Sequence, residues 1–215
     1  MNTWPIGADG AAPNPDGGLT PSQTVGPFFG HALPFAGGPD LVPAHTPGAI
    51  RVHGTVYDGE GVPVPDAIVE FWQADAAGRI PQAQGSFARD GATFTGWGRC
   101  AVDRLGRYAF DTVKPGAVDA DALPYIAVSV FARGMLRRVV TRMYFPEDTG
   151  RPEDPGGPEG ADPAPTPAPA RVGDPVFSVV PAARHETLIA VPEESGSYRF
   201  DVHIQGEKET VFFAV

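Results

Sequence analysis

The sequence predicts an all-β protein, an antiparallel β-sandwich of about nine short strands with long loops and little helix. Short apolar runs rich in Val, Ile, Phe and Tyr recur along the chain, and several alternate apolar and polar residues with a period of two. Turn-forming residues separate these runs, since the 215 residues include 27 glycines and 25 prolines. A hydrophobic fraction of 42% indicates a buried core, which a chain of this length can form in one domain.

The clearest strand pattern lies at residues 50–57, which alternate apolar and polar side chains as in a strand with one buried face. Residues 58–61, Asp-Gly-Glu-Gly, follow as a turn in which glycine takes positive φ at little cost. The next run ends at Phe71 and Trp72 and is apolar on both faces, so we expect it to be covered on both sides. We predict that these two strands form a hairpin on which the rest of the fold is built.

The later elements follow from the same signals. We predict two further hairpins, residues 97–103 with 107–113 and residues 125–133 with 136–145, the second joined at Gly134. The elements expected after these are one helical turn at residues 175–180 and strands at residues 186–191, 198–204 and 210–215. Short strands at these spacings are typical of a sandwich rather than of an alternating α/β fold.

The domain organisation follows from composition. Residues 1–49 are predicted to form an extended N-terminal arm and loop region that packs on a partner, because Gly, Pro and Asp occur there without periodicity. Residues 50–215 are predicted to form the β-sandwich domain. Within it, residues 149–173 are rich in proline, glycine and acidic residues, which bury too little apolar area to become ordered. We therefore expect an exposed insertion within a single domain.

Charge and cysteine content restrict the partners and the compartment. The formal net charge of -10 disfavours nucleic acid, because phosphate binding needs a basic surface. No apolar run approaches the ~20 residues of a membrane helix, so we expect no membrane partner. The single cysteine, Cys100, excludes an intramolecular disulfide framework. The first basic residue is Arg51, so no signal segment is expected at the start, and we predict a cytoplasmic protein.

The histidines do not follow a metal-ligand spacing. None of His31, His45, His53, His185 and His203 occurs in an HxH, HxxxH or HExxH pattern that would aim two imidazoles at one ion. His53 and His203 lie in predicted strands, where they either converge through the fold or serve as ordinary hydrogen-bonded histidines.

The patterns of nucleophilic and phosphate-binding sites do not occur in the sequence. There is no Gly-x-Ser-x-Gly elbow, and Cys100 lies inside an apolar strand, so we expect a buried structural thiol. No glycine-rich phosphate loop occurs in the strand-to-helix context that it requires.

Arginine is the unusual feature, since it supplies 14 of the 16 basic residues. Arg133, Arg137, Arg138 and Arg142 fall within ten positions of an otherwise acidic chain. A guanidinium binds carboxylates bidentately, so this hairpin is a candidate site for an anionic small molecule or an acidic partner. A solvated strand face with local ion pairs is the interpretation we prefer for the last three. Arg133 differs, because it ends an apolar strand beside Gly134 and can reach into a cleft.

Several collinear segments resemble the intradiol ring-cleavage dioxygenases. They are residues 20–28 (TPSQTVGPF), 52–78 (VHGTVYDGEGVPVPDAIVEFWQADAAG), 114–116 (KPG), 131–145 (FARGMLRRVVTRMYF) and 199–213 (RFDVHIQGEKETVFF). The resemblance covers nearly all of the chain except the N-terminal arm and the proline-rich insertion. It implies a β-sandwich whose iron-binding members hold a non-haem ferric iron with two tyrosines and two histidines.

This sequence departs from the iron-binding pattern at every ligand position. Ile80 and the segment around Val118 stand where the resemblance places the two tyrosines. Tyr125 and Ala127 stand where it places the two histidines. One phenolate without its three companions does not make an iron site. The resemblance therefore implies no metal ligand in this chain and a non-haem Fe(III) held by a partner beta subunit.

Loss of all four ligands on an intact scaffold is similar to the family's non-metal alpha chains, which form heterodimers, in larger assemblies, with an iron-bearing beta subunit. The matching residues imply Thr24, Gly26 and Pro27 as substrate-binding residues and Arg133 as a catalytic residue. The implied substrates are O2 and an anionic catechol such as protocatechuate, cleaved to 3-carboxy-cis,cis-muconate in the beta-ketoadipate pathway.

Two alternatives stay open at the level of the sequence. One is a freestanding β-sandwich interaction or carbohydrate-binding module that kept the scaffold without catalysis. The other is a homomeric enzyme with an unrecognised metal site. Purification of the chain alone separates them, since ligand binding without a partner favours the module, bound iron favours the enzyme, and instability favours the obligate subunit.

Overall fold

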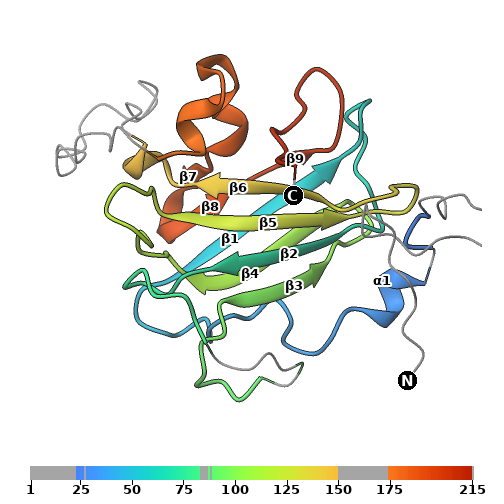
Figure 1. The fold of residues 1–215 in the computed structure, drawn as a ribbon. Helices are drawn as coiled ribbons and strands as arrows, with labels where there is room; N and C mark the ends of the chain where they lie inside the picture. Colours follow the sequence, from blue (N-terminus) through green and yellow to red (C-terminus); the bar gives the residue numbers. More distant parts are fainter. Residues whose placement is uncertain (1–22, 27, 83–86, 88, 150–173, 215) are drawn as a thin grey trace, which may run out of the picture.

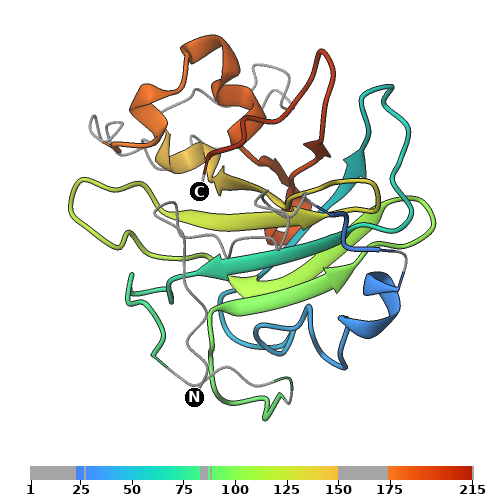
Figure 2. The same ribbon diagram turned by 45° about the vertical axis from the view of Figure 1, so that its right-hand side comes forward.

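Two β-sheets pack face to face in the part of the chain that the computed structural model describes, residues 23–26, 28–82, 87, 89–149 and 174–214 (Figures 1 and 2). The first sheet comprises β1 (Ala49–Tyr57), β4 (Arg107–Val113), β7 (Val191–Glu193), β8 (Ser197–Arg199) and β9 (Val202–His203). The second comprises β2 (Ile68–Gln73), β3 (Trp97–Ala101), β5 (Tyr125–Phe131) and β6 (Val139–Tyr144). The predicted all-β sandwich is confirmed.

The strand order is β4-β1-β8-β7 in the first sheet, with β9 also paired to β1, and β3-β2-β5-β6 in the second. Most pairs are antiparallel, but β8 and β9 run parallel to β1. The helical segments are α1 (Phe29–Ala32) and the 3-10 helices η1 (Pro146–Asp148), η2 (Phe177–Val179), η3 (Ala182–Leu188) and η4 (Glu194–Gly196). Among the described residues, none of these is long and apolar enough to cross a membrane.

The core lies between the two sheets. Phe71 on β2 stacks on Phe110 on β4, with 3.9 Å between ring centroids, and both side chains are fully buried. Val52 on β1 and Val128 on β5 are also fully buried in this cluster. Each such side chain contributes about 1.5–3 kcal/mol when it leaves water. The strands form because their alternate residues, in β1 and β4 especially, face this shared interior.

Two of the three predicted hairpins are wrong, because their strands belong to different sheets. β1 lies in the first sheet and β2 in the second, and β3 and β4 are divided in the same way. The turn after β1 does form, with the Gly61 N–H donating to the Asp58 carbonyl at 3.2 Å. The pairing with β1 continues to Val64, whose N–H donates to the Val56 carbonyl at 2.9 Å. Pro65 follows, and because proline cannot donate to a strand ladder, the chain leaves the first sheet there. The third hairpin, β5 with β6, is confirmed.

Three local expectations also need correction. A strand is expected at residues 186–191, but residues 186–188 belong to η3, and β7 begins only at Val191. Residues 210–214 lie outside any strand, although the Phe213 N–H donates to the Val140 carbonyl at 2.8 Å and so follows β6. Trp72, expected to be covered, is 56% exposed. The helical turn expected at residues 175–180 is present as η2.

The described part of the N-terminal region packs on the sandwich itself. Leu41 belongs to the core cluster, and the Arg99 Nη1 donates to the Leu33 carbonyl at 2.7 Å. Arg99 also pairs with Glu70 at 2.6 Å, and both side chains are almost buried. Residues 1–22 and most of the predicted insertion, residues 150–173, lie outside the described residues.

A cluster of charges links the end of β4 to η1 and β8. The Lys114 Nζ lies 2.6 Å from the Glu147 carboxylate and 2.7 Å from that of Asp148. The Tyr198 hydroxyl donates to Glu147 at 2.8 Å. Burial opposes ionisation of Glu147, but the hydrogen bonds from Lys114 and Tyr198 outweigh it, so the pKa of Glu147 is lowered. Burial and the bond to Glu147 raise the pKa of Tyr198.

We predict that Glu147→Gln destabilises the fold at neutral pH but not in acid. A carboxyl whose pKa is lowered in the folded state contributes stability above its unfolded pKa, about 4.5, and loses it as the pH falls through the folded value. The urea midpoints of wild type and Glu147→Gln should therefore differ at pH 7 and converge as the pH falls below 4.5 and through the folded pKa of Glu147. Glu60→Gln, at an exposed turn, is the control, and an unchanging difference at Glu147 would contradict the prediction.

Candidate functional site

The four positions that correspond to the family's iron ligands line one small cavity of about 130 Å³. Tyr125 is the first residue of β5, and Ala127 lies two residues further on the same face of the strand. Ile80 lies in the loop after β2, and Val118 lies in the loop after β4. Residues from three separate parts of the sequence therefore meet at one place.

Two glycines allow the loop after β2 to contact the loop after β4. Gly78 has φ +80°, and a Cβ there would overlap the carbonyl oxygen of Ala117. The Gly116 N–H donates to the Asp75 carbonyl at 2.9 Å. The Asp75 carboxylate accepts the backbone N–H of Arg79 at 2.9 Å, and this bond is the main reason that the pKa of Asp75 is lowered. The close approach of the loops fixes the walls of the cavity.

The lining does not supply the ligand set of an iron site. Besides the four positions, the cavity is lined by Trp72, Gln73, Ala74, Pro81, Thr95 and Gly116, all of them uncharged. Tyr125 supplies a phenol, but none of the described residues places an imidazole or a carboxylate in the cavity wall. Across the described residues, no group of three or more His, Cys, Asp or Glu side chains is placed to hold a metal ion. Non-haem iron is held by several imidazole, carboxylate or phenolate ligands, so these residues do not fit it.

A cation already lies against this site. The Arg142 guanidinium stacks 3.9 Å from the centre of the Tyr125 ring. Arg142 pairs across the sheet with Ala127, which in turn pairs with Trp72. The sequence alone favours a solvated strand face with local ion pairs for Arg142, and only the pairing register places it beside the cavity.

Arg133 and Thr24 lie together, away from this cavity. The Thr24 Oγ1 accepts the N–H of Gly134 at 3.1 Å, which brings the N-terminal loop to the turn that carries Arg133. The Arg133 side chain is 64% exposed and pairs through Nε with Asp66 at 3.1 Å. Gly26 has φ +77°, and Pro27 lies outside the described residues. The role of these residues toward a substrate stays a prediction.

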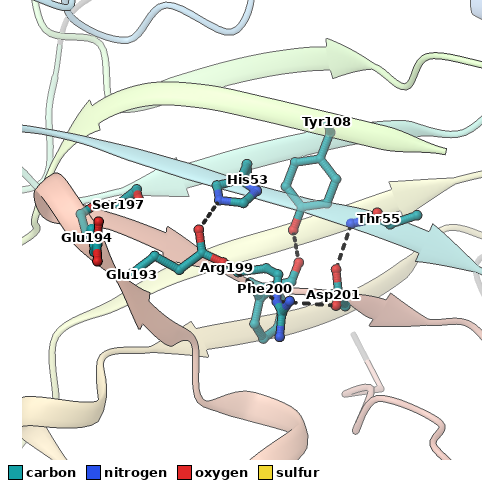
Figure 3. A network of polar contacts seen from close by, with 9 residues as sticks. All are labelled: His53, Thr55, Tyr108, Glu193, Glu194, Ser197, Arg199, Phe200 and Asp201. Carbon is teal, nitrogen blue, oxygen red and sulfur yellow. Dashed lines mark hydrogen bonds and ion pairs between the residues drawn. The ribbon is translucent and has the colours of Figure 1, made fainter. Parts of the chain in front are cut away.

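His53 lies in a polar network between β1 and the C-terminal strands (Figure 3). The His53 Nε2 pairs with the Glu193 carboxylate at 2.9 Å, and the Asp201 carboxylate accepts the Thr55 N–H at 2.9 Å. These contacts tie β1 to the C-terminal strands. His203 lies opposite Tyr57 and stacks on it, with 4.8 Å between ring centroids. The two histidines thus have separate partners.

Cys100 is half-buried in β3 rather than fully buried. Desolvation raises the pKa of its thiol. A thiol with a raised pKa is protonated at neutral pH and is a weak nucleophile, so the prediction of a structural cysteine agrees with its surroundings.

The comparisons with known proteins agree on one family. The family model described as Dioxygenase matches residues 25–206. The chain is 40% identical over 212 residues to the protocatechuate 3,4-dioxygenase alpha chain of Burkholderia cepacia, covering 91% of this chain and 97% of that protein. It is 34% identical over 175 residues to the beta chain from the same species, covering 75% and 66%. The intradiol ring-cleavage dioxygenase from Tetranychus urticae shares the fold, with a TM-score of 0.53 at 15% identity over 80% and 87% of the two chains.

The loop contact at Gly78 gives a stability prediction with a matched control. Gly61 has φ +77° and open space around its α-carbon, so Gly61→Ala should cost only backbone strain, about 1–2 kcal/mol. Gly78→Ala carries the same strain and a clash with Ala117, so we expect a loss of about 3 kcal/mol or more. Urea denaturation of the two variants measures the difference. Equal losses would show that the two loops separate without cost.

Proposed function

The chain belongs to the intradiol ring-cleavage dioxygenase family, and from this membership we propose that it is the alpha chain of a protocatechuate 3,4-dioxygenase. It is an oxidoreductase subunit, and its relatives include named alpha and beta chains. One observation carries the proposal: the four ligand-equivalent positions meet in a cavity whose lining has no imidazole and no carboxylate. A chain built in this way requires a partner to hold the iron.

The proposed reaction cleaves 3,4-dihydroxybenzoate between its two hydroxyl-bearing carbons. The C3–C4 bond breaks and both atoms of O2 enter the product, 3-carboxy-cis,cis-muconate. A non-haem Fe(III) held by the beta chain supplies the binding of the catecholate and its reaction with O2. The residues of this chain bind and orient the substrate. The single cysteine supports a reducing compartment, for which we propose the cytoplasm.

Arg133 is the residue that we propose acts on the substrate. A catecholate that also bears a carboxylate brings excess negative charge into a site of low dielectric, where a nearby guanidinium stabilises it more than in water. The exposure of the Arg133 side chain lets a partner chain cover it. Thr24, Gly26 and Pro27 would form the neighbouring wall, since Thr24 is hydrogen-bonded beside Arg133.

The surface around Arg133 supports contact with a partner. Val25, Phe28 and Leu136 lie within four residues of Thr24 or Gly134 and are 45%, 76% and 59% exposed. Exposed large apolar side chains in the segments that flank a charged residue are typical of an interaction surface. We propose that the beta chain covers this surface and presents its iron site to Arg133.

We predict that the purified chain alone holds no stoichiometric iron and has no dioxygenase activity, while co-expression with the beta chain gives a stable, iron-containing complex. The reason is the ligand set of the cavity, which lacks imidazole and carboxylate groups. Metal analysis, the visible tyrosinate-to-iron absorption and size-exclusion chromatography measure these properties. Stoichiometric iron in the lone chain would refute the proposal. A lone chain that is monomeric, stable and indifferent to the beta chain would favour the interaction module.

We predict that Arg133→Ala in the assembled enzyme lowers kcat/KM by roughly 100-fold, the usual loss for one oriented charge stabiliser. Arg133→Lys should recover only part of this, because a point charge lacks the planar fork. Arg138→Ala removes an exposed arginine five residues away and should leave turnover unchanged. Iron content and assembly are measured in every variant. Unchanged kinetics in Arg133→Ala at full iron content would reduce Arg133 to a partner of Asp66.

A further inference from the structure

The cavity that contains the four ligand-equivalent positions has the size of a small ligand site. Its volume of about 130 Å³ is close to the roughly 150 Å³ of an engineered apolar cavity that takes up benzene. Trp72, Ile80, Pro81, Val118 and Ala127 supply apolar walls, and none of the lining residues is charged. Such a surface favours a flat apolar molecule over a hydrated ion.

Two of the polar groups in the lining are already paired. The Gln73 Nε2 donates to the last carbonyl of β4 at 2.8 Å, and its Oε1 accepts the Thr112 hydroxyl at 2.8 Å. The Thr95 hydroxyl oxygen accepts the Arg89 Nη1 at 2.9 Å. The Tyr125 hydroxyl, in contrast, makes no hydrogen bond to the described residues, so it is the polar group that a ligand can meet.

Neighbouring side chains hold one wall of the cavity in place, and apolar side chains surround its opening. The Tyr125 ring is held by the Arg142 guanidinium at 3.9 Å and by the Tyr144 ring, whose centroid is 6.1 Å away. Trp72 and Ile80 are 56% and 57% exposed. A ring that enters the cavity therefore removes apolar area of both residues from water, which favours binding.

We propose that this cavity binds a neutral, single-ring aromatic compound, with a ring hydroxyl hydrogen-bonded to Tyr125. A carboxylated ring is disfavoured, because its charge would lie against a lining in which no residue is charged. The site is thus distinct from the one in the proposed function, which takes an anionic ring beside Arg133. The inference does not depend on that function, since it uses only the geometry of this chain.

Fluorine NMR of 4-fluorophenol, titrated with the assembled protein, tests the proposal. We expect a dissociation constant on the order of 0.1–1 mM, as is usual for so small a ligand. Ala127→Leu and, independently, Val118→Phe fill the cavity from the strand and from the loop, and each should weaken binding at least tenfold. Ala101→Leu adds the same side chain as the first at an exposed position of β3 and should leave binding unchanged. Equal binding by wild type and both filled variants would overturn the proposal.

A second pair of ligands distinguishes the contribution of the hydrogen bond to Tyr125 from that of the apolar contacts. Tyr125→Phe should weaken 4-fluorophenol about three- to tenfold and leave fluorobenzene unchanged, because only the former meets the hydroxyl. In Arg133→Ala, which removes the cation of the proposed substrate site, 4-fluorophenol binding that depends on Ala127 should persist. If 4-fluorobenzoate binds as tightly as 4-fluorophenol, and Ala127→Leu weakens its binding as well, the proposal that the cavity prefers neutral rings is wrong.

Discussion

The stacking of Phe71 on Phe110 is the contact on which the rest of the structure depends. The two rings come from different sheets, lie 3.9 Å apart and are fully buried, so neither sheet can exclude water from its inner face without the other. Because successive residues of a strand point to opposite faces, an inward Phe71 directs Glu70 and Trp72 outward. Glu70 then pairs with Arg99, and Trp72 becomes a wall of the cavity. The packing between the two sheets thus determines where Trp72 and the cavity lie on the outer face of the second sheet.

Local pattern predicted the strands well and their partners poorly. The period-two alternation of residues 50–57 fits β1 closely, since it reports one buried face. A tight turn, however, fixes only the local direction of the chain, so the turn at residues 58–61 does not by itself predict a full hairpin. The prolines at positions 63 and 65 are the sequence signal that the pairing with β1 is short. No comparable signal marks the crossing between β3 and β4, where the partner strands are distant in sequence.

In the candidate site, too, the sequence located some residues but not their spatial neighbours. The resemblance to a family located Ile80, Val118, Tyr125 and Ala127, but no spacing in the sequence indicated that they line one cavity. That fact depends on the contact between the two loops, which the glycines at positions 78 and 116 permit. Trp72 and Arg142 could not have been assigned from sequence, because their neighbours are set by the register of β2, β5 and β6. Side chains on a sheet acquire partners only when the pairing is known.

Strand β5 separates the cavity from Arg133. Tyr125, beside the cavity, begins the strand, and Phe131 ends it about 20 Å away at roughly 3.3 Å per residue. Arg133 lies beyond that end and pairs with Asp66 at the start of the β2 region. A single substrate of one ring cannot span this distance, so Arg133 cannot assist chemistry at the chain's own cavity. If Arg133 acts on a catechol, the reacting centre must therefore belong to another chain that covers the turn at Gly134. On this geometry, the proposed division of labour between subunits accounts both for the absence of an iron ligand set among the described residues at one end of β5 and for the exposed arginine at the other.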